Sequence, residues 1–203
     1  MFTGIVQGIG EIITKSLVNT VTSVEIKLPD VENLKIGASV SINGVCLTVV
    51  AINDDVIQFD IIDETINRTN LSEASVGDYV NIERSLKFGD EVGGHILSGH
   101  IFATGIIKSK TKSGDQMKIN ILAPPSIHKY LTEKGYIAID GISLTVGKVV
   151  NGSFDLHIIP ETMRLTTLES KEVGDAVNIE IDSNTQLIVE TIERLLKDRG
   201  VTE

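Results

Sequence analysis

The chain contains 203 residues with a formal net charge of −10 at pH 7, and an acidic surface of this kind repels phosphate, which argues against nucleic acid as a partner. Its single cysteine excludes an internal disulfide and fits a cytoplasmic protein. No apolar run approaches the ~18 residues that suggest a membrane span. Tryptophan is absent and aromatic residues make up 4%, so the core must be built from Val, Ile and Leu, which favours strands.

Strands are predicted where short β-branched runs are bounded by Asn, Asp and Gly, at Val21–Lys27, 46–52, Val56–Ile62 and Tyr79–Arg84. Before them, Gly8 and Gly10 interrupt a strand pattern and predict a bend or bulge. Residues 53–55 and the Asn151-Gly152 pair have the composition of hairpin turns. These short antiparallel strands indicate small closed barrels, with a sandwich as the alternative.

Two helices are predicted in the second half of the chain. Ser126 follows two prolines and is suited to cap a helix that ends near Gly135. A longer helix is predicted over residues 184–199, where apolar residues recur at helical spacing: Leu187, Ile188, Ile192, Leu195 and Leu196. This stripe packs either on its own barrel or against another copy of the chain.

An internal repeat divides the chain. Residues 44–83 align without a gap on residues 141–180, and 17 of the 40 aligned positions are identical. A repeat of this length indicates two whole domains rather than solenoid units. We place the first domain at 1–97, including a glycine-rich linker at 89–97, the second at 98–183, and the C-terminal helix at 184–203.

Positions shared by the two copies serve the fold or a common ligand, whereas positions that differ serve an asymmetric step. Thr48 and Thr145 are shared, as are the two Glu-Thr pairs at 64–65 and 161–162. Cys46 aligns with Ser143. Both are weak nucleophiles without a base nearby in the sequence, and a small cysteine also suits a core.

His95 and His100 belong to the sequence Gly-Gly-His-Ile-Leu-Ser-Gly-His. Their spacing, without a nearby carboxylate or thiol cluster, argues against a metal site. We interpret them as proton-transfer or ligand residues, with a merely polar linker as the alternative. No glycine-rich stretch has the strand–turn–helix context of a phosphate-binding motif.

Four motifs in the same order resemble riboflavin synthase of the alpha type, a family with two lumazine-binding repeats. They are Met-Phe-Thr-Gly-Ile-Val at 1–6, Asn-Gly-Val-Cys-Leu-Thr-Val at 43–49, Gly-Gly-His with Ser-Gly-His at 93–100, and Asp-Gly-Ile-Ser-Leu-Thr-Val at 140–146. The resemblance covers the whole chain. It implies a mainly β fold of two tandem six-stranded antiparallel barrels with a C-terminal helix.

The resemblance also implies a reaction. Each barrel would bind one 6,7-dimethyl-8-ribityllumazine, and transfer of a four-carbon unit between the two would give riboflavin and 5-amino-6-(D-ribitylamino)uracil without a cofactor or metal. It further implies a homotrimer, formed through the C-terminal helices, in which the first barrel of one chain faces the second barrel of a neighbour. Association with lumazine synthase is a further partner to consider.

Site residues follow from the same resemblance. Those at catalytic positions are Ser39, Cys46, His100 and Asp182. Around the first ligand it places Phe2, Gly4, Ile5, Val6, Cys46, Leu47, Thr48, Asp60, Ile61, Ile62, Asp63, Glu64 and Thr65. Around the second it places Gly99, His100, Ile101, Lys134, Ser143, Leu144, Thr145, Ile158, Ile159, Pro160, Glu161, Thr162 and Met163.

Two other functions compete with this interpretation. The first is a non-catalytic lumazine- or flavin-binding protein of the light-emission type, which tends to lose the ligand motif of the second repeat. Here Ser98-Gly99-His100 and the residues around Ser143 are intact, which favours the enzyme. The second is a hydrolase using Cys46 and His100, for which no nucleophile elbow is present.

Overall fold

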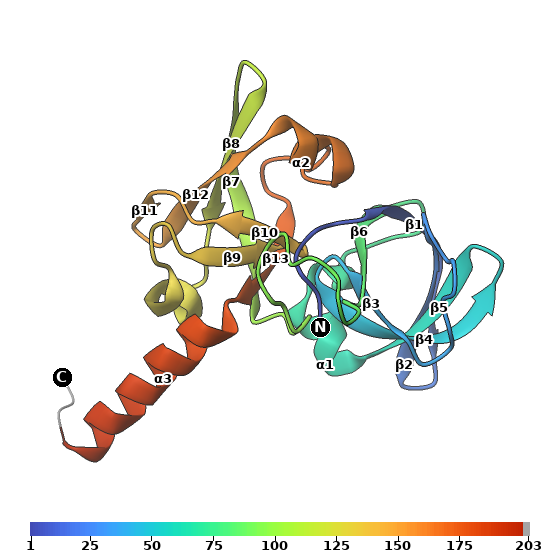
Figure 1. The fold of residues 1–203 in the computed structure, drawn as a ribbon, viewed down its shortest axis with the longest axis horizontal. Helices are drawn as coiled ribbons and strands as arrows, with labels where there is room; N and C mark the ends of the chain where they lie inside the picture. The colour runs from blue at the N-terminus through green and yellow to red at the C-terminus, as the bar shows by residue number, and fades with distance from the viewer. Residues whose placement is uncertain (201–203) are drawn as a thin grey trace.

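The first repeat forms a closed antiparallel barrel in a computed structural model that describes residues 1–200 (Figure 1). Its strand order is β1-β2-β5-β4-β3-β6, and pairing of β1 with β6 closes it. The strands are β1 Gly8–Val18, β2 Val21–Lys27, β3 Ser39–Ile42, β4 Val45–Asn53, β5 Val56–Ile62 and β6 Tyr79–Arg84. Alternate residues of each strand point into the barrel, as Ile57, Phe59 and Ile61 do in β5. This closure excludes the sandwich alternative for this repeat.

The second repeat has the same strand neighbours but is an open, curled sheet. Its order is β10-β9-β13-β7-β8-β12-β11. The strands are β7 Ala103–Ser113, β8 Gln116–Leu122, β9 Tyr136–Ile139, β10 Ile142–Thr145, β11 Val149–Val150, β12 Ser153–Ile158 and β13 Ala176–Ile181. The predicted mainly β fold is confirmed. In this repeat the sheet has seven strands rather than six, because the counterpart of β4 is divided into β10 and β11.

The division of that strand occurs at Gly147. Its N–H donates to the backbone oxygen of Asp155 at 2.7 Å, while the N–H of Val146 donates to Gly135 at 2.9 Å. The chain thus leaves one neighbouring strand before it joins the next. A Cβ atom at Gly147 would lie 2.7 Å from the Asp155 oxygen, so the close approach depends on glycine.

Short helices connect the last strands of each repeat. These are α1 Asp63–Arg68 and the 3₁₀ helix η1 Asn70–Ser72 in the first repeat, and α2 Pro160–Leu165 in the second. The pattern at 126–135 predicts a helix, but only a 3₁₀ helix, η2 Pro125–Tyr130, is present. The C-terminal helix is confirmed as α3 Ser183–Asp198, capped by the side chain of Asp182, while residues 201–203 of its predicted segment lie outside the described part.

Helix α3 projects away from both repeats (Figure 1). The middle of the helix contacts η2, where the Tyr130 hydroxyl donates to Glu190 at 3.0 Å and Lys129 forms an ion pair with Glu193. The predicted apolar stripe is 44–66% exposed: Leu187, Ile188, Ile192, Leu195 and Leu196. The stripe does not pack on its own barrel. Within residues 1–200, no helix is long and apolar enough to cross a membrane.

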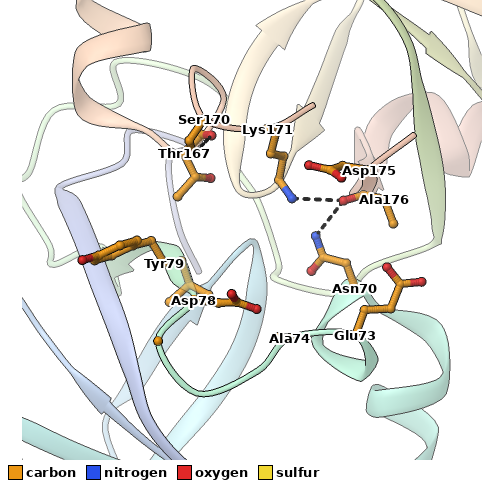
Figure 2. Close-up of a pocket in the computed structure, with 12 residues that line it drawn as sticks. Asn70, Glu73, Ala74, Asp78, Tyr79, Thr167, Ser170, Lys171, Asp175 and Ala176 are labelled. Carbon is orange, nitrogen blue, oxygen red and sulfur yellow. Dashed lines mark hydrogen bonds between the residues drawn. The ribbon is translucent and has the colours of Figure 1, made fainter. Parts of the chain in front are cut away.

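The two repeats meet through matching polar residues. The amide of Asn178 donates to the backbone oxygen of Asn43 at 2.8 Å, and that of Asn81 donates to Asp140 at 3.0 Å. Beside them lies a cleft, shown in Figure 2, in which the side chains of Lys171 and Asn70 both donate to the Ala176 oxygen, at 3.1 and 3.2 Å. This contact sets how the repeats sit against each other.

Candidate functional site

Each repeat is crossed by the segment that precedes the first strand of the other. The N–H of Ser143 donates to Gly4 at 2.8 Å, and the N–H of Cys46 donates to Gly99 at 2.9 Å. Both glycines have a positive φ, +75° and +81°. A Cβ atom on either would lie 2.5 Å from the Cβ of the residue that it faces, so only glycine allows this approach.

Two buried glutamates hold the crossing segments in place. Glu83 accepts hydrogen bonds from the Thr3 N–H and hydroxyl at 2.6 and 2.8 Å, and from the Gly4 N–H at 3.0 Å. Glu180 accepts the matching bonds from Ser98 at 2.7 and 2.8 Å, and from Gly99 at 3.2 Å. Burial raises the pKa of both carboxyl groups, and these hydrogen bonds oppose the rise.

The Cys46 pocket is the first candidate site. Cys46, at the start of β4, and His100, on the crossing segment, line a cavity of about 380 Å³. Its other lining residues come from the start of β4, from α1 and the residue after it, and from the crossing segment: Val45, Glu64, Thr65, Arg68, Thr69, Gly99 and Ile101. A thiol, an imidazole and a guanidinium thus face one space. The backbone N–H of His100 donates to the Ser98 hydroxyl at 3.2 Å, and that hydroxyl donates to Glu180. Glu180 therefore also holds the backbone of His100 in place.

Ser143 marks the equivalent place in the second repeat. Its hydroxyl lies 2.6 Å from Nδ1 of His95, which comes from the linker. Burial lowers the pKa of His95, and the charge of Asp182 acts in the opposite direction. The side chain of Asp182 caps α3 by accepting from the Thr185 N–H at 2.8 Å.

The crossing changes which predicted residues belong together. The resemblance groups Gly4 with the first site and Gly99-His100 with the second. The structure instead places Gly4 against Ser143, and Gly99 with His100 against Cys46. Each site is consequently made from both repeats. Because Gly4 and Gly99 are equivalent, the counterpart of His100 is Ile5.

Several predicted ligand residues lie inside the repeats. Five have side chains in, or packed against, the hydrophobic cores: Leu47, Ile61, Leu144, Ile158 and Met163. Four of these side chains are buried, whereas that of Leu144 is half-buried. Others are exposed: Thr48, Asp60, Ile62, Asp63, Thr145, Ile159, Pro160 and Glu161. Thr162 is half-buried at the base of α2.

The remaining predicted residues are dispersed. Phe2 is buried with Leu97 and Ala138 in a small cluster that packs against Cys46. Val6 belongs to the core of the second repeat. Ser39 pairs with Thr48 across β3 and β4. Lys134 is exposed and has a φ of +68°.

Sequence reasoning overlooked the two anchoring glutamates. Glu83 and Glu180 occupy the same place in the Val-Asn-Ile-Glu sequence that both copies share. That identity, at the end of a buried strand, was the available signal. A buried carboxylate needs hydrogen-bond donors, and the crossing segments supply them.

The cleft of Figure 2 has a similar volume, about 400 Å³, but shares no residue with the Cys46 pocket. Its walls include the residues that join the repeats, and they contain none of the predicted site residues. Among residues 1–200, no group of three or more His, Cys, Asp or Glu side chains could hold a metal ion. We therefore take the Cys46 pocket and the surroundings of Ser143 as the candidate sites.

Comparison with known proteins identifies the repeats. The lumazine binding domain family matches residues 3–85 and again residues 98–182. Riboflavin synthase of Escherichia coli is 46% identical over 202 residues, which covers 98% of this chain and 95% of that protein. Riboflavin synthase of Mycobacterium tuberculosis is 40% identical over 205 residues, covering 98% of this chain and 100% of that protein.

Solved structures agree with this assignment. The crystal structure of LumP complexed with 6,7-dimethyl-8-(1'-D-ribityl) lumazine superposes with a TM-score of 0.82 at 30% identity, covering 90% of this chain and 100% of that one. The identity to the riboflavin synthases is higher, and it extends over nearly the whole chain. The chain therefore belongs to the lumazine-binding domain family and, within it, to the riboflavin synthases.

Proposed function

We propose that this enzyme binds two molecules of 6,7-dimethyl-8-ribityllumazine at its two related sites and transfers a four-carbon unit from one to the other. The products are riboflavin and 5-amino-6-(D-ribitylamino)uracil. The observation that carries the proposal is the full-length identity of 40–46% to riboflavin synthases, together with two sites of matching construction. LumP supports a binding protein as the second candidate, but at lower identity.

The chemistry suits a protein that contributes mainly positioning. The two products together contain the atoms of two substrates, so the reaction needs no external oxidant, reductant or group donor. The C7 methyl of the lumazine is acidic because the ring delocalises its anion. Holding two reactants in attack geometry can supply roughly 7–11 kcal/mol of the barrier, and proton transfer to or from the ring contributes further.

A reaction between identical molecules still needs one donor and one acceptor, and the positions at which the repeats differ supply this asymmetry. The first site has Cys46 and His100 where the second has Ser143 and Ile5. We assign His100 to proton transfer at the Cys46 pocket, with Cys46 and Ser39 beside the ring. Asp182 lies between Ile181 and Ser183, which line a cavity together with His100, and we assign it to the proton transfers because the family resemblance places it at a catalytic position.

The proposal extends to assembly. The exposed apolar stripe of α3 supports oligomerisation, since a stripe this large is rarely left in water. The family resemblance favours a homotrimer, in which the Cys46 pocket of one chain faces the Ser143 site of another. A cytoplasmic enzyme fits the single cysteine. Association with lumazine synthase belongs to the same proposal and is tested by co-sedimentation.

The direct test incubates purified protein with the lumazine and follows flavin absorbance. The enzyme forms riboflavin. Lumazine fluorescence that persists at its bound intensity without flavin would support the binding-protein candidate instead.

Variants separate chemistry from binding. His100→Ala and Cys46→Ser should slow single-turnover formation of riboflavin while leaving lumazine affinity within about tenfold, or ~1.4 kcal/mol. Thr145→Ala should weaken binding by ~1–3 kcal/mol, because it leaves a ring hydrogen bond unmade. If His100→Ala lost affinity but kept its rate, His100 would be a ligand contact and the assignment would be wrong.

A further inference from the structure

His95 is enclosed on several sides beside Ser143. Its Nδ1 lies 2.6 Å from the Ser143 hydroxyl oxygen, and its ring stacks on Tyr136 with centroids 5.0 Å apart. Its backbone N–H donates to Thr3 at 3.1 Å, and only 7% of the residue is exposed. The preceding residue, Gly94, lies against Ser143 so closely that a Cβ atom there would be 2.8 Å from the hydroxyl oxygen. The linker is thus shaped to deliver this imidazole to Ser143.

The Cys46 pocket lacks this arrangement. Tyr136 aligns with Ser39 of the first repeat, and a serine side chain offers no ring for an imidazole to stack on. The histidine at that pocket, His100, comes instead from the crossing segment and is exposed. The contact between His95 and Ser143 is therefore a difference between two sites that otherwise match.

The surroundings of His95 select one protonation state. Its Nε2 is buried and has no hydrogen-bond partner among the described residues. A buried N–H without an acceptor is rarer and costlier than a buried acceptor without a donor. The proton of the neutral ring therefore belongs on Nδ1, from which it is donated to the Ser143 oxygen. The serine hydroxyl proton is then free to point away from His95.

We propose that His95 is a positioning residue, which donates a hydrogen bond from Nδ1 to the Ser143 hydroxyl oxygen. The serine hydroxyl proton is thereby directed toward the heterocycle bound at the second site, where a carbonyl oxygen or a ring nitrogen accepts it. The inference rests on the proposed function for the identity of that heterocycle. It adds a cause for asymmetry: the ring at Ser143 meets a hydroxyl donor of fixed direction, whereas the ring at the Cys46 pocket meets a thiol and a solvent-exposed imidazole.

A double-mutant cycle tests the coupling. His95→Leu should lower the single-turnover rate about tenfold, the loss caused by about 1.4 kcal/mol from one hydrogen bond. In the Ser143→Ala background the same change should have no further effect. His95→Asn, which can place an amide N–H where Nδ1 lies, should recover most of the rate. His128→Leu is the matched control, because the His128 ring bonds to the Ala123 backbone oxygen at 3.0 Å and should act independently of Ser143.

Nitrogen NMR of the unmodified protein provides a readout apart from activity. A protonated Nδ1 and unprotonated Nε2 of His95 are expected in the absence of substrate. Protonation on Nε2 instead, or effects of His95→Leu and Ser143→Ala that multiply, would overturn the proposal. Absence of riboflavin formation by the wild-type protein would contradict the proposed function but leave the NMR result standing, so the two failures are distinguishable.

Discussion

Substitution of Glu180 by Gln tests whether a buried carboxylate holds the segment that carries His100. The carboxylate accepts from the Ser98 N–H and hydroxyl and from the Gly99 N–H, at 2.7–3.2 Å. The Gly99 N–H is shared between Oε1 and Oε2, each at 3.2 Å, whereas both Ser98 bonds go to Oε1. A glutamine of the same shape keeps the oxygen at Oε1, but its NH₂ group replaces Oε2 and opposes the Gly99 N–H. The bonds to Oε1 lose their charge assistance, and the bond from Gly99 to Oε2 is lost.

The expected cost follows from these bonds. Hydrogen bonds to charged groups contribute about 1.5–3 kcal/mol and neutral ones about 0.5–1.5 kcal/mol. The losses are partly offset because an amide is easier to bury than a carboxylate, whose pKa burial raises here. We expect Glu180→Gln to lower the free energy of unfolding by about 2 kcal/mol, and the midpoint of thermal unfolding by roughly 4–8 °C.

The assay combines unfolding with thiol reactivity. Because Gly99 accepts from the Cys46 N–H at 2.9 Å, loosening the segment should expose the thiol and speed its modification. Glu83→Gln is the matched control, since it breaks the equivalent anchor at Thr3 and should cost similar stability without changing Cys46 reactivity. Equal thiol reactivity in the two variants, or unfolding unchanged by Glu180→Gln, would show that Glu180 does not hold the segment that carries His100.

Three further predictions follow from the same structure. Gly99→Ala should lower the free energy of unfolding by about 2–4 kcal/mol, because backbone strain at a positive φ and a clash with Cys46 add. Gly77→Ala, where φ is +92° but no atom lies near the added Cβ, should lower it by about 1 kcal/mol. Burial lowers the pKa of His95 in the folded protein below the ordinary value of 6.5. As the pH falls, His95 is therefore protonated in the unfolded chain before it is protonated in the folded one, and the free energy of unfolding should decrease below pH 6.5. Denaturation at several pH values should show a smaller decrease in His95→Asn. Truncation before residue 184 should give monomers by light scattering, and an unchanged mass would contradict the role of α3.

The strands were predictable because local chemistry determines them. Val56–Ile62 and Tyr79–Arg84 have the predicted bounds, since β-branched residues there are enclosed by turn residues. Helix α1 escaped prediction because six residues cannot show a helical stripe. The division of the fourth strand of the second repeat depends on contacts of Gly147 with Asp155, which no periodicity reveals.

The candidate site was predictable residue by residue but not in its grouping. The strands of the two copies align at a spacing of 97 residues, whereas the crossing glycines, Gly4 and Gly99, are 95 apart. This offset of two hides their equivalence, and the crossing itself is a long-range contact. His95 was predicted to handle protons or contact ligand, but its burial against Ser143 depends on how the linker folds back.

The stoichiometry of the reaction tests most directly whether two lumazines react with each other on this protein. Purified protein and 6,7-dimethyl-8-ribityllumazine are mixed without added nucleotide or metal, and both products are measured as the substrate disappears. We expect one riboflavin and one 5-amino-6-(D-ribitylamino)uracil for every two lumazines consumed. Bound lumazine that remains unconverted, or riboflavin formed without an equal amount of the second product, would contradict it.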